Sequence, residues 1–485
     1  MQLIDADQHF SRPLRKNAMT RKADQIQRSD PDKRAVGLLV MGARGCRQVI
    51  GTFRPQHWRL VALDAVTLKS IEANWQYEGD SQSESGTAFF DTRHRERLIV
   101  STGKQRITLN PANIIGNFPA VCALRNDGKL HAWGWAENGG ELPENVRALK
   151  DVVEIASSMA AFAVRRASGH VLAWGSADNP SSSVPAKISA MNDIVAIYGG
   201  AYVFVARRSN GQIVAWGLEE AGGRLPDEIA ELNDIVDAMG SQFAFAALRS
   251  SGQVVAWGDS RNGGELPEAI GALKDVVQLA SSGDVLAIRR ANGQIDVWGN
   301  PAFTHIPPEI ANLRDIVDLV GKSSAFAARR ANGQVVGWGF QQSDTPPEEI
   351  ADLTDIVHVT CTSDAFIALR STGQVVAWGQ GQVALVSDAI TRLSDIVAIS
   401  TNHEAAVALR SNGEAIAWGD PETGGDSSSV APLLTHVRAV YAGTFTFTAL
   451  REDGRVVAWG DAHKGGTGEQ KALDRLISYA EKPVP

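Results

Sequence analysis

Apolar residues recur along residues 110–485 in short runs that are separated by turn residues at a regular interval. In the stretch SNGQIVAWG, Ser209 to Gly217, an Asn-Gly turn precedes a β-rich run and a Trp-Gly pair. Variants of this stretch occur nine times, with a period of 40 to 42 residues, and their Trp-Gly pairs begin at Trp133, Trp174, Trp216, Trp257, Trp298, Trp338, Trp378, Trp418 and Trp459. A fixed period of this length is typical of a repeat architecture.

Each repeat has the pattern of three short strands and one helical turn. A glycine five residues before each Trp, usually preceded by Asn, Asp or Ser, predicts a hairpin turn, because these residues tolerate a positive φ. Runs such as FAFAALR and QVVAWG flank the turn, and a third run such as DIVDA lies upstream. The segment LPDEIAELN, Leu225 to Asn233, has Pro226 at a first helical position, which predicts a helical turn that crosses to the next repeat.

Neighbouring repeats have to stack, because a three-stranded sheet of this size cannot bury both of its faces alone. Short antiparallel sheets arranged radially form a β-propeller, and an open solenoid is the alternative. The first strand of the first repeat is degraded to NPANII, whereas the C-terminus carries an additional β-rich run, RLISYA, at residues 475–480. We therefore predict an all-β fold, a β-propeller of about nine three-stranded blades closed by a C-terminal strand. Residues 475–480 are expected to pair with the second or third strand of the first repeat.

The residues before the repeats differ from them in pattern and in charge. Residues 36–109 contain β-rich runs without Trp-Gly pairs, which predicts a small all-β module with Trp58 and Trp75 in its core. Residues 1–60 hold 12 Lys and Arg against 5 Asp and Glu, a net charge of +7, and the remaining 35 against 50 give −15. We predict a basic, disordered tail at residues 1–35, with contact to nucleic acid or anionic lipid as the alternative. The acidic propeller at 110–485 argues against general nucleic-acid binding.

Every repeat also has an arginine three residues before its turn glycine. In seven repeats an aspartate precedes this arginine by 15 residues, as Asp234 precedes Arg249. This spacing places the two residues on adjacent antiparallel strands, which predicts a cross-strand ion pair. An arginine rim that binds anions is the alternative. Arg451 is an exception, because His436 stands where its aspartate would be.

The repeated G-x-V-x-A-W-G hairpins and the LP-E segments between them resemble the regulator of chromosome condensation repeat family, from about Asn110 to the C-terminus. The short period is most similar to the bacterial branch that includes the type II β-lactamase inhibitory protein. The resemblance implies a propeller that binds other proteins through loops on one face. Activities known in the family include guanine-nucleotide exchange on a small GTPase and inhibition of an enzyme. The chain differs in having nine repeats rather than seven, and it has no long insertion like the wedge of the exchange factor.

Catalytic and metal-binding motifs are not found in the sequence. There is no Gly-rich phosphate loop, HExxH or GxSxG motif, the ten histidines are scattered, and the three cysteines form no CxxC pair. We therefore expect no enzymatic activity, cofactor or metal. The sequence has no run of 18 apolar residues, so it predicts no membrane-spanning helix. The polar N-terminus indicates a cytoplasmic protein or one exported without a cleaved signal.

Function is expected where the repeats differ, in their loops. The loop between the first and second strands is polar in repeats five to eight and apolar in the others, where it carries Phe445, Phe118, Met159, Tyr198, Tyr202, Met239 and Phe243. In a closed ring these residues form one arc, which predicts a protein-binding surface, with burial between blades as the alternative. A second candidate surface is the loop after Trp-Gly, where Trp135, Phe303 and Phe340 lie. The predicted function is a non-enzymatic protein-binding propeller. The alternatives are a secreted effector or adhesin-like module, an enzyme inhibitor and a guanine-nucleotide exchange factor.

Overall fold

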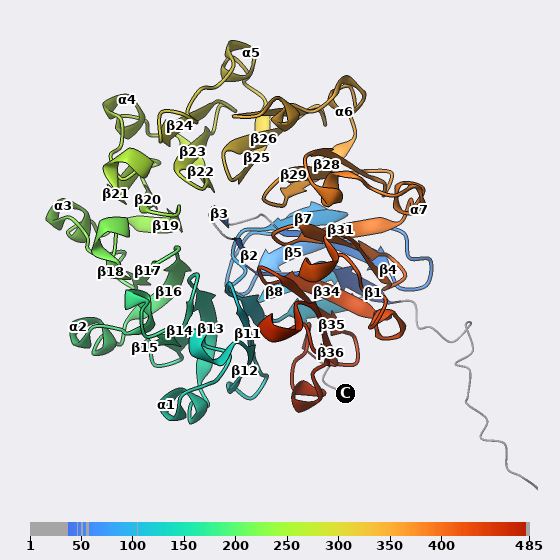
Figure 1. Cartoon of the computed structure of the whole chain (residues 1–485), viewed down its shortest axis with the longest axis horizontal. Helices are drawn as coiled ribbons and strands as arrows, with labels where there is room; N and C mark the ends of the chain where they lie inside the picture. The colour runs from blue at the N-terminus through green and yellow to red at the C-terminus, as the bar shows by residue number, and fades with distance from the viewer. Residues whose placement is uncertain (1–36, 46, 50–51, 55–57, 104, 482–485) are drawn as a thin grey trace, which may run out of the picture.

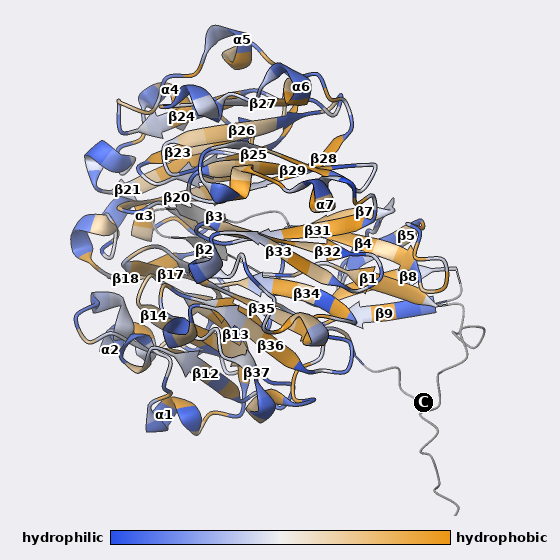
Figure 2. Cartoon of the chain, turned by 45° about the vertical axis from the view of Figure 1, so that its right-hand side comes forward, coloured by the Kyte–Doolittle hydropathy of each residue, from blue (hydrophilic) through white to orange (hydrophobic). Residues whose placement is uncertain are grey.

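The chain forms a ring of nine β-sheets with a small β-sandwich against it (Figure 1). The computed structural model describes residues 37–481 except 46, 50–51, 55–57 and 104. The basic tail predicted at residues 1–35 lies outside the described residues. Figure 2 shows that apolar residues concentrate in the strands, whereas the short helices at the edge of the ring are largely polar.

Each of the nine sheets is one blade of a β-propeller and contains three antiparallel strands in chain order. The first four blades are β10 (Ile114–Gly116), β11 (Ala120–Leu124) and β12 (Leu130–Gly134); β13 (Val152–Ser157), β14 (Ala161–Arg166) and β15 (Val171–Gly175); β16 (Ile194–Gly199), β17 (Val203–Arg208) and β18 (Ile213–Gly217); and β19 (Ile235–Gly240), β20 (Ala244–Arg249) and β21 (Val254–Gly258).

The next five blades are β22 (Val276–Ser282), β23 (Val285–Arg290) and β24 (Ile295–Gly299); β25 (Ile316–Lys322), β26 (Ala325–Arg330) and β27 (Val335–Gly339); β28 (Ile356–Cys361), β29 (Ala365–Arg370) and β30 (Val375–Gly379); β31 (Ile396–Thr401), β32 (Ala405–Arg410) and β33 (Ala415–Gly419); and β34 (Val437–Ala442), β35 (Thr446–Arg451) and β36 (Val456–Gly460). A two-residue strand, β37 (Gly468–Glu469), extends the ninth blade. The predicted all-β propeller fold is confirmed.

A short helix crosses from one blade to the next in seven places, as the repeat pattern predicts. These helices are α1 (Glu144–Arg147), α2 (Ala186–Ser189), α3 (Asp227–Ala230), α4 (Glu268–Gly271), α5 (Pro308–Ala311), α6 (Glu348–Ala351) and α7 (Asp388–Thr391). Pro226 caps α3 rather than occupying its first turn, and Ile229 is buried beneath the helix. The hairpin turn in the same repeat needs Gly211, whose φ is +82° and whose added Cβ would lie 2.1 Å from the Asn233 carbonyl oxygen.

The Trp of each Trp-Gly pair packs against the preceding blade. Trp257 stacks on Phe245 of its own blade at 5.5 Å between ring centroids, and both rings pack on the small residues of β16 and β17. The Trp257 indole N–H donates to the Gly222 carbonyl at 2.9 Å, in the loop that leaves the preceding blade. Equivalent bonds of 2.9 to 3.1 Å join eight of the nine tryptophans to a preceding loop. Trp338 Nε1 has no hydrogen-bond partner among the described residues.

The ring closes directly between the ninth and the first blade. Strand β10 lies against β34, and the Trp133 indole donates to the Gly465 carbonyl at 3.0 Å, the same bond that joins the other blades. The first blade has its own first strand, β10, although its sequence is degraded. The predicted pairing of residues 475–480 with the second or third strand of the first repeat is therefore wrong. Ala480 forms an isolated bridge with Leu109, before the repeat, and the Asn126 amide, in the turn after β11, donates to the Leu476 carbonyl.

The residues before the propeller form a two-layered β-sandwich, with β1 (Leu38–Met41), β4 (Trp58–Asp64) and β7 (Ala88–Asp91) in one sheet and β6 (Glu84–Gly86), β5 (Ala73–Tyr77), β8 (Leu98–Thr102) and β9 (Gln105–Leu109) in the other. Trp75 is buried in its core, as predicted; the side chain of Trp58 is outside the described part. A separate hairpin, β2 (Arg47–Val49) and β3 (Thr52–Arg54), lies inside the ring, with β2 against β10 and β34 and β3 against β19, β22 and β25.

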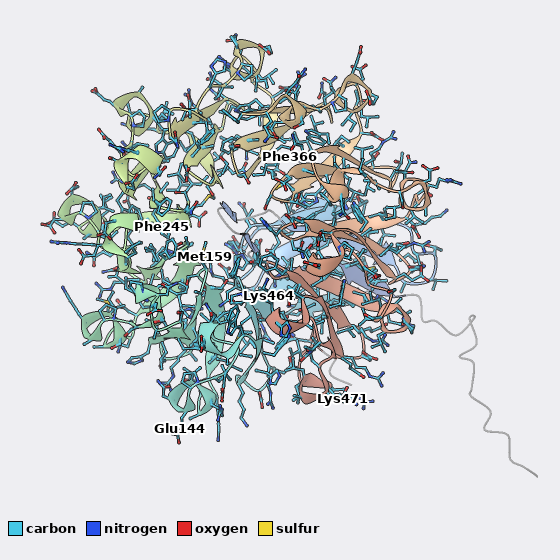
Figure 3. All side chains as sticks on the ribbon, in the orientation of Figure 1. Glu144, Met159, Phe245, Phe366, Lys464 and Lys471 are labelled. Carbon is cyan, nitrogen blue, oxygen red and sulfur yellow. The ribbon has the colours of Figure 1, made fainter. Side chains whose placement is uncertain are left out.

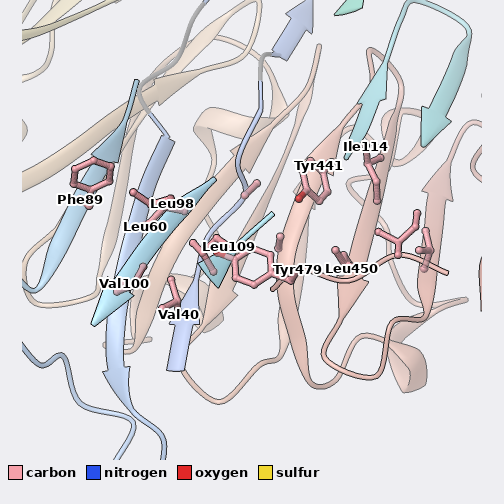
Figure 4. Packing of buried hydrophobic residues seen from close by; sticks show 14 of the residues in the cluster. Val40, Leu60, Phe89, Leu98, Val100, Leu109, Ile114, Tyr441, Leu450 and Tyr479 are labelled. Atoms are coloured by element: carbon pink, nitrogen blue, oxygen red, sulfur yellow. The ribbon is translucent and has the colours of Figure 1, made fainter. Parts of the chain in front are cut away.

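The sheet β1–β4–β7 is covered on both faces. Val40 and Leu60 point into the sandwich, whose core continues through Leu109 to Tyr441 of blade nine and Tyr479 near the C-terminus (Figure 4). The alternate residues of β1 and β4 pack on blades eight and nine. The sandwich and the last blades therefore share one continuous hydrophobic core, and Ile477, Tyr479 and Ala480 belong to it rather than to a blade.

The predicted cross-strand ion pairs are confirmed. Arg249 Nε lies 3.0 Å from Asp234 Oδ1, and all seven Asp–Arg pairs have distances of 2.9 to 3.1 Å. Arg451, which lacks this aspartate, pairs with Asp453 at 3.1 Å instead. The arginine rim thus has a structural role within the blades, and each half-exposed pair contributes about 0 to 1 kcal/mol.

Trp257→Phe and Trp338→Phe form a matched pair of variants. Both changes keep an aromatic ring, but only Trp257→Phe leaves a buried carbonyl, that of Gly222, without its donor. We expect Trp257→Phe to lower the free energy of unfolding by about 1 to 3 kcal/mol more than Trp338→Phe does. Denaturant unfolding followed by tryptophan fluorescence measures the difference. Equal losses in the two variants would show that the indole bond does not stabilise the ring.

Truncation after Asp474 removes Ile477 and Tyr479, which are buried in the shared core. We expect this truncation to lower the free energy of unfolding by about 5 kcal/mol, since two large buried side chains are lost together. Ser478→Ala is the control, because Ser478 bonds only to polar groups near the surface. A truncated protein that melts at the same temperature as the full chain would contradict this account of the C-terminus.

Candidate functional site

The two faces of the ring carry different loops. We call upper the face with the loops between the first and second strands of each blade and the segments after Trp-Gly. We call lower the face with the hairpin turns between the second and third strands. Because strand directions repeat in every blade, all loops of one kind lie on the same face. The variable loops therefore gather on the upper face.

The β-sandwich occupies the lower face. The Gly42 amide donates to the Arg438 carbonyl at 2.9 Å, and Arg59 Nη1 donates to the Val397 carbonyl at 2.8 Å, at the lower ends of blades nine and eight. Two blades beyond blade nine, Arg95 forms an ion pair of 2.6 Å with Glu154 in blade two. Among the described residues, the sandwich thus contacts the lower ends of first strands in blades eight and nine and reaches Glu154 in blade two, and none of these contacts involves an upper loop.

The upper loops between first and second strands are tied to one another by backbone hydrogen bonds. The His403 amide donates to the Thr444 carbonyl at 3.1 Å, the Phe118 amide to the Met159 carbonyl at 3.0 Å, and the Met159 amide to the Ala201 carbonyl at 2.9 Å. These bonds hold the loops of consecutive blades at fixed spacing around the inner rim. Figure 3 shows Met159 and Lys464 toward the middle of the ring, whereas Glu144 and Lys471 lie at its outer edge.

The predicted aromatic arc is present in part and crosses the point of ring closure. Phe118 and Phe445, from blades one and nine, meet edge to face at 5.0 Å between centroids. The Lys464 ammonium lies 3.5 Å from the Phe445 centroid and also pairs with Asp461 at 3.0 Å. Both rings are half-buried, so each keeps an accessible edge beside a cation. Closure brings together two residues that 327 positions of sequence separate.

The arc continues through blades two to four. Met159 is half-buried and is joined by its backbone to the loops of blades one and three. Tyr202 and Phe243 lie nearly parallel at 6.3 Å between centroids, and both are half-buried. These five side chains are therefore neither buried as a set nor fully exposed, and four of them form two ring pairs.

Two residues of the predicted arc belong to the core instead. Tyr198 is only 6% exposed and Met239 only 3%, because both lie within first strands rather than in the loops that follow. The Arg95 guanidinium of the sandwich lies 4.5 Å from the Tyr198 ring centroid. Burial raises the pKa of the Tyr198 hydroxyl. The side chain therefore contributes to the contact between sandwich and propeller.

The second predicted surface, after Trp-Gly, contains the most exposed aromatic rings. Phe340 is 70% exposed and Trp135 50% exposed. Phe303 and Phe340 meet edge to face at 5.7 Å between centroids, on blades five and six. Trp135 lies next to the arc, because its amide donates to the carbonyl of Pro119, the residue after Phe118.

The upper loops of blades five to eight are polar, as the sequence indicates. Asp364 is exposed, and Asp284 and Glu404 are half-buried. Burial, together with the nearby Asp259 carboxylate, raises the pKa of Asp284. The loops between first and second strands thus form an aromatic sector over blades nine and one to four and an acidic sector over blades five to eight. The Phe303–Phe340 pair lies outside the aromatic sector, on the segments that follow Trp-Gly in blades five and six.

Sequence reasoning missed two sets of residues that the structure brings forward. Lys464 lies in the loop after the last Trp-Gly, and only ring closure places it over Phe118 and Phe445. Four repeats also carry a second arginine directly before the paired one, as Arg289 precedes Arg290. Because side chains alternate along a strand, the first arginine of each doublet faces away from the ion pair of the second. The doubling of arginine in these repeats is the sequence signal that distinguishes this first arginine from the ion-paired one.

Chemical motifs for catalysis or metal binding were not expected from the sequence. Within the described residues, no group of three His, Cys, Asp or Glu side chains could hold a metal ion. Cys122 and Cys361 are buried free thiols. In the same residues, no helix is long and apolar enough to cross a membrane.

Comparison with known proteins finds likeness in fold. No protein-family model and no curated protein matches the chain. Prp20p of Saccharomyces cerevisiae is 14% identical over 65% of this chain and 83% of its own, with a TM-score of 0.35. The CRINKLY WD40 ectodomain of the Arabidopsis thaliana receptor kinase ACR4 is 17% identical over 59% and 98%, with a TM-score of 0.37. BamB of Moraxella catarrhalis is 13% identical over 63% and 90%, with a TM-score of 0.31.

These similarities concern the fold alone. Prp20 is the yeast RCC1, so structural neighbours include a member of the family whose repeats this sequence resembles. No comparison tests the narrower resemblance to the bacterial branch. At these identities and TM-scores the neighbours carry no argument about function, and the description of the site rests on the chain itself.

Tyr198→Ala and Tyr202→Ala test the division between core and surface. Tyr198 is packed under the sandwich, so its truncation should lower the free energy of unfolding by about 3 to 5 kcal/mol. Tyr202 is half-buried on the upper rim, and its truncation should cost about 1 kcal/mol. Thermal unfolding of the two variants measures both effects. A larger loss for Tyr202→Ala than for Tyr198→Ala would show that the upper loop is core.

Proposed function

We propose that the chain is a non-enzymatic propeller that binds another protein through its upper face. The observation that carries the proposal is the aromatic sector formed by Phe118, Met159, Tyr202, Phe243 and Phe445. It lies on the upper face, opposite the contacts that the described part of the sandwich makes with blades eight and nine. Trp135 extends this surface toward the outside of blade one.

The aromatic sector has the properties of an interface rather than of a solvated loop. Tyr and Phe rings present large apolar areas with few rotatable bonds, so they bind a partner at a low cost in side-chain entropy. The backbone bonds between Phe118, Met159 and Ala201 hold the rings in place before binding. Binding energy is expected from these rings, and polar residues around them contribute little when truncated.

The acidic sector is expected to select among partners. Asp284, Asp364 and Glu404 face the same side as the aromatic rings. Complementary charge mainly raises the rate of association and discourages partners of like charge. A partner with an apolar patch beside a basic one suits the two sectors together. The resemblance to the bacterial short-repeat branch, in which a propeller inhibits an enzyme, supports the proposal that the partner is a protein.

Affinity capture with matched variants tests the proposal. Wild-type protein, Tyr202→Ala, Phe243→Ala and Asp364→Ala are immobilised and exposed to an extract of the cells that express the chain. We expect one protein to be retained by the wild type and by Asp364→Ala. The two aromatic variants should bind it about tenfold or more weakly, because a truncated anchor costs roughly 2 kcal/mol. Circular dichroism confirms that the variants are folded.

The outcome also distinguishes the alternatives. A captured hydrolase whose activity falls on binding would make the chain an inhibitor, and a captured GTPase would point to exchange. Retention of the same partner by both aromatic variants with undiminished affinity would show that the aromatic sector is not the binding surface.

A further inference from the structure

A cleft of about 460 Å³ lies between the sandwich and the lower ends of blades five and six. The sandwich contributes β5, β7 and the loop between β5 and β6, and the propeller contributes Arg289, Arg329 and Asp318. This is the face opposite the aromatic sector, so the cleft plays no part in the proposed protein binding. Its lining combines aromatic rings with two guanidinium groups.

The propeller side of the cleft has more positive than negative charge. Arg289 and Arg329 are the first arginines of their doublets, on neighbouring second strands. The carboxylate of Asp318, only 5% exposed, lies near both and favours their charged forms. Burial lowers the pKa of each guanidinium, and repulsion between the two lowers that of Arg289 further. Two cations thus share one carboxylate at the base of the cleft.

Blade two shows which partner Arg289 lacks, a carboxylate on the adjacent strand. There, Arg165 occupies the position of Arg289 and forms an ion pair of 2.7 Å with Glu154 on the adjacent strand. In blade five the equivalent strand position holds Gln278, which accepts from Arg289 Nε at 2.8 Å and donates to Asp318 at 3.2 Å. A neutral amide therefore stands in blade five where blade two has Glu154 and blade six has Asp318.

Arg329 is also incompletely bonded. Its Nε is buried and has no hydrogen-bond partner among the described residues. Its guanidinium carbon lies 5.5 Å from the centroid of Phe90, a half-buried ring of the sandwich that lines the same cleft. Arg59 lies close enough that repulsion from Arg329 contributes to lowering its pKa, to about 10, although burial is the larger cause. A buried donor without an acceptor beside like charges is the arrangement that a bound anion satisfies.

We propose that this cleft binds a small organic anion. A carboxylate or phosphate group lies between Arg289 and Arg329, and the carbon body of the ligand packs against Phe90. Guanidinium groups suit both anions, because their N–H donors form paired hydrogen bonds with two oxygens. Glu84 lines the exposed side of the cleft and disfavours a second negative charge there, whereas Asp80 is paired with Arg93 at 2.7 Å. The ligand therefore carries its charge at one end only.

Titration calorimetry of the full chain with benzoate, phenyl phosphate and inorganic phosphate tests the site. We expect benzoate or phenyl phosphate to bind, and the stronger of the two identifies the anion class. Inorganic phosphate should bind more weakly, because it has no carbon body for Phe90. Arg289→Gln and Arg329→Gln should each weaken binding about tenfold, as expected for loss of one charge-assisted contact.

Arg290→Gln is the matched control. It removes the same charge one residue away, where the side chain pairs with Asp275 at 3.0 Å on the other side of the sheet, and should leave binding unchanged. Asp318→Asn keeps the shape of the site and removes the carboxylate that the described propeller residues contribute to the cleft, so it should strengthen binding even if an arginine variant does not fold.

Two results would overturn the proposal. The first is the absence of binding by all three probes at millimolar concentration to the wild-type chain. The second is binding that Asp318→Asn does not strengthen and that Arg290→Gln weakens as much as Arg289→Gln does. Because the aromatic sector lies on the upper face, Arg289→Gln should retain the protein partner, which separates failure of this site from failure of the proposed function.

Discussion

A buried indole N–H that donates to a carbonyl of the preceding blade is the interaction on which the ring depends. One such bond has a modest net energy of about 1 kcal/mol, but losing it leaves a buried carbonyl unsatisfied, which costs more. The glycine after each Trp makes the bond possible. Gly258, with a φ of +110°, turns the chain where an added Cβ would lie 2.7 Å from the Phe243 carbonyl oxygen. The turn sends the following loop over its own blade, where it meets the Trp of the next one.

The same bond explains how a ring closes without a shared strand. Trp133 and Gly465 are 332 residues apart, yet their geometry matches that of neighbouring repeats. Closure then positions Phe445 against Phe118 and places Lys464 above both rings. The aromatic sector of the upper face is thus a consequence of ring closure rather than of any local sequence feature.

Departures from the repeat determine where the sandwich sits. Near the lower end of the second strand, blades eight and nine carry Leu409 and Leu450, which pack in the cores that the sandwich shares. At the same position blades five and six carry Arg289 and Arg329, and there a cleft separates the sandwich from the propeller. At this position, the blades that share a core with the sandwich are apolar, and the two blades beside the cleft are cationic.

Local patterns predicted the blades well, and long-range contacts were harder to predict. The Trp-Gly period, the turn glycines and the spacing of Asp234 and Arg249 each reflect contacts within one repeat, so the sequence carries them directly. The place of the RLISYA segment depends on Tyr479 reaching Gly42, 437 residues away, and no repeat pattern contains that contact. Within the site, Tyr198 lies in strand β16 and is buried, whereas Tyr202 follows the strand and is half-buried. The sequence pattern did not show where this strand ends, so it did not separate the core ring from the surface ring.

Hydrogen–deuterium exchange on the chain, alone and bound to its captured partner, tests most directly the claim that the upper face is the binding face. We expect slower exchange on binding in residues 117–119, 200–202, 241–243 and 443–445, with strands β4 and β7 of the sandwich unchanged. Slower exchange confined to the sandwich and the lower hairpin turns, with the upper loops unaffected, would contradict it.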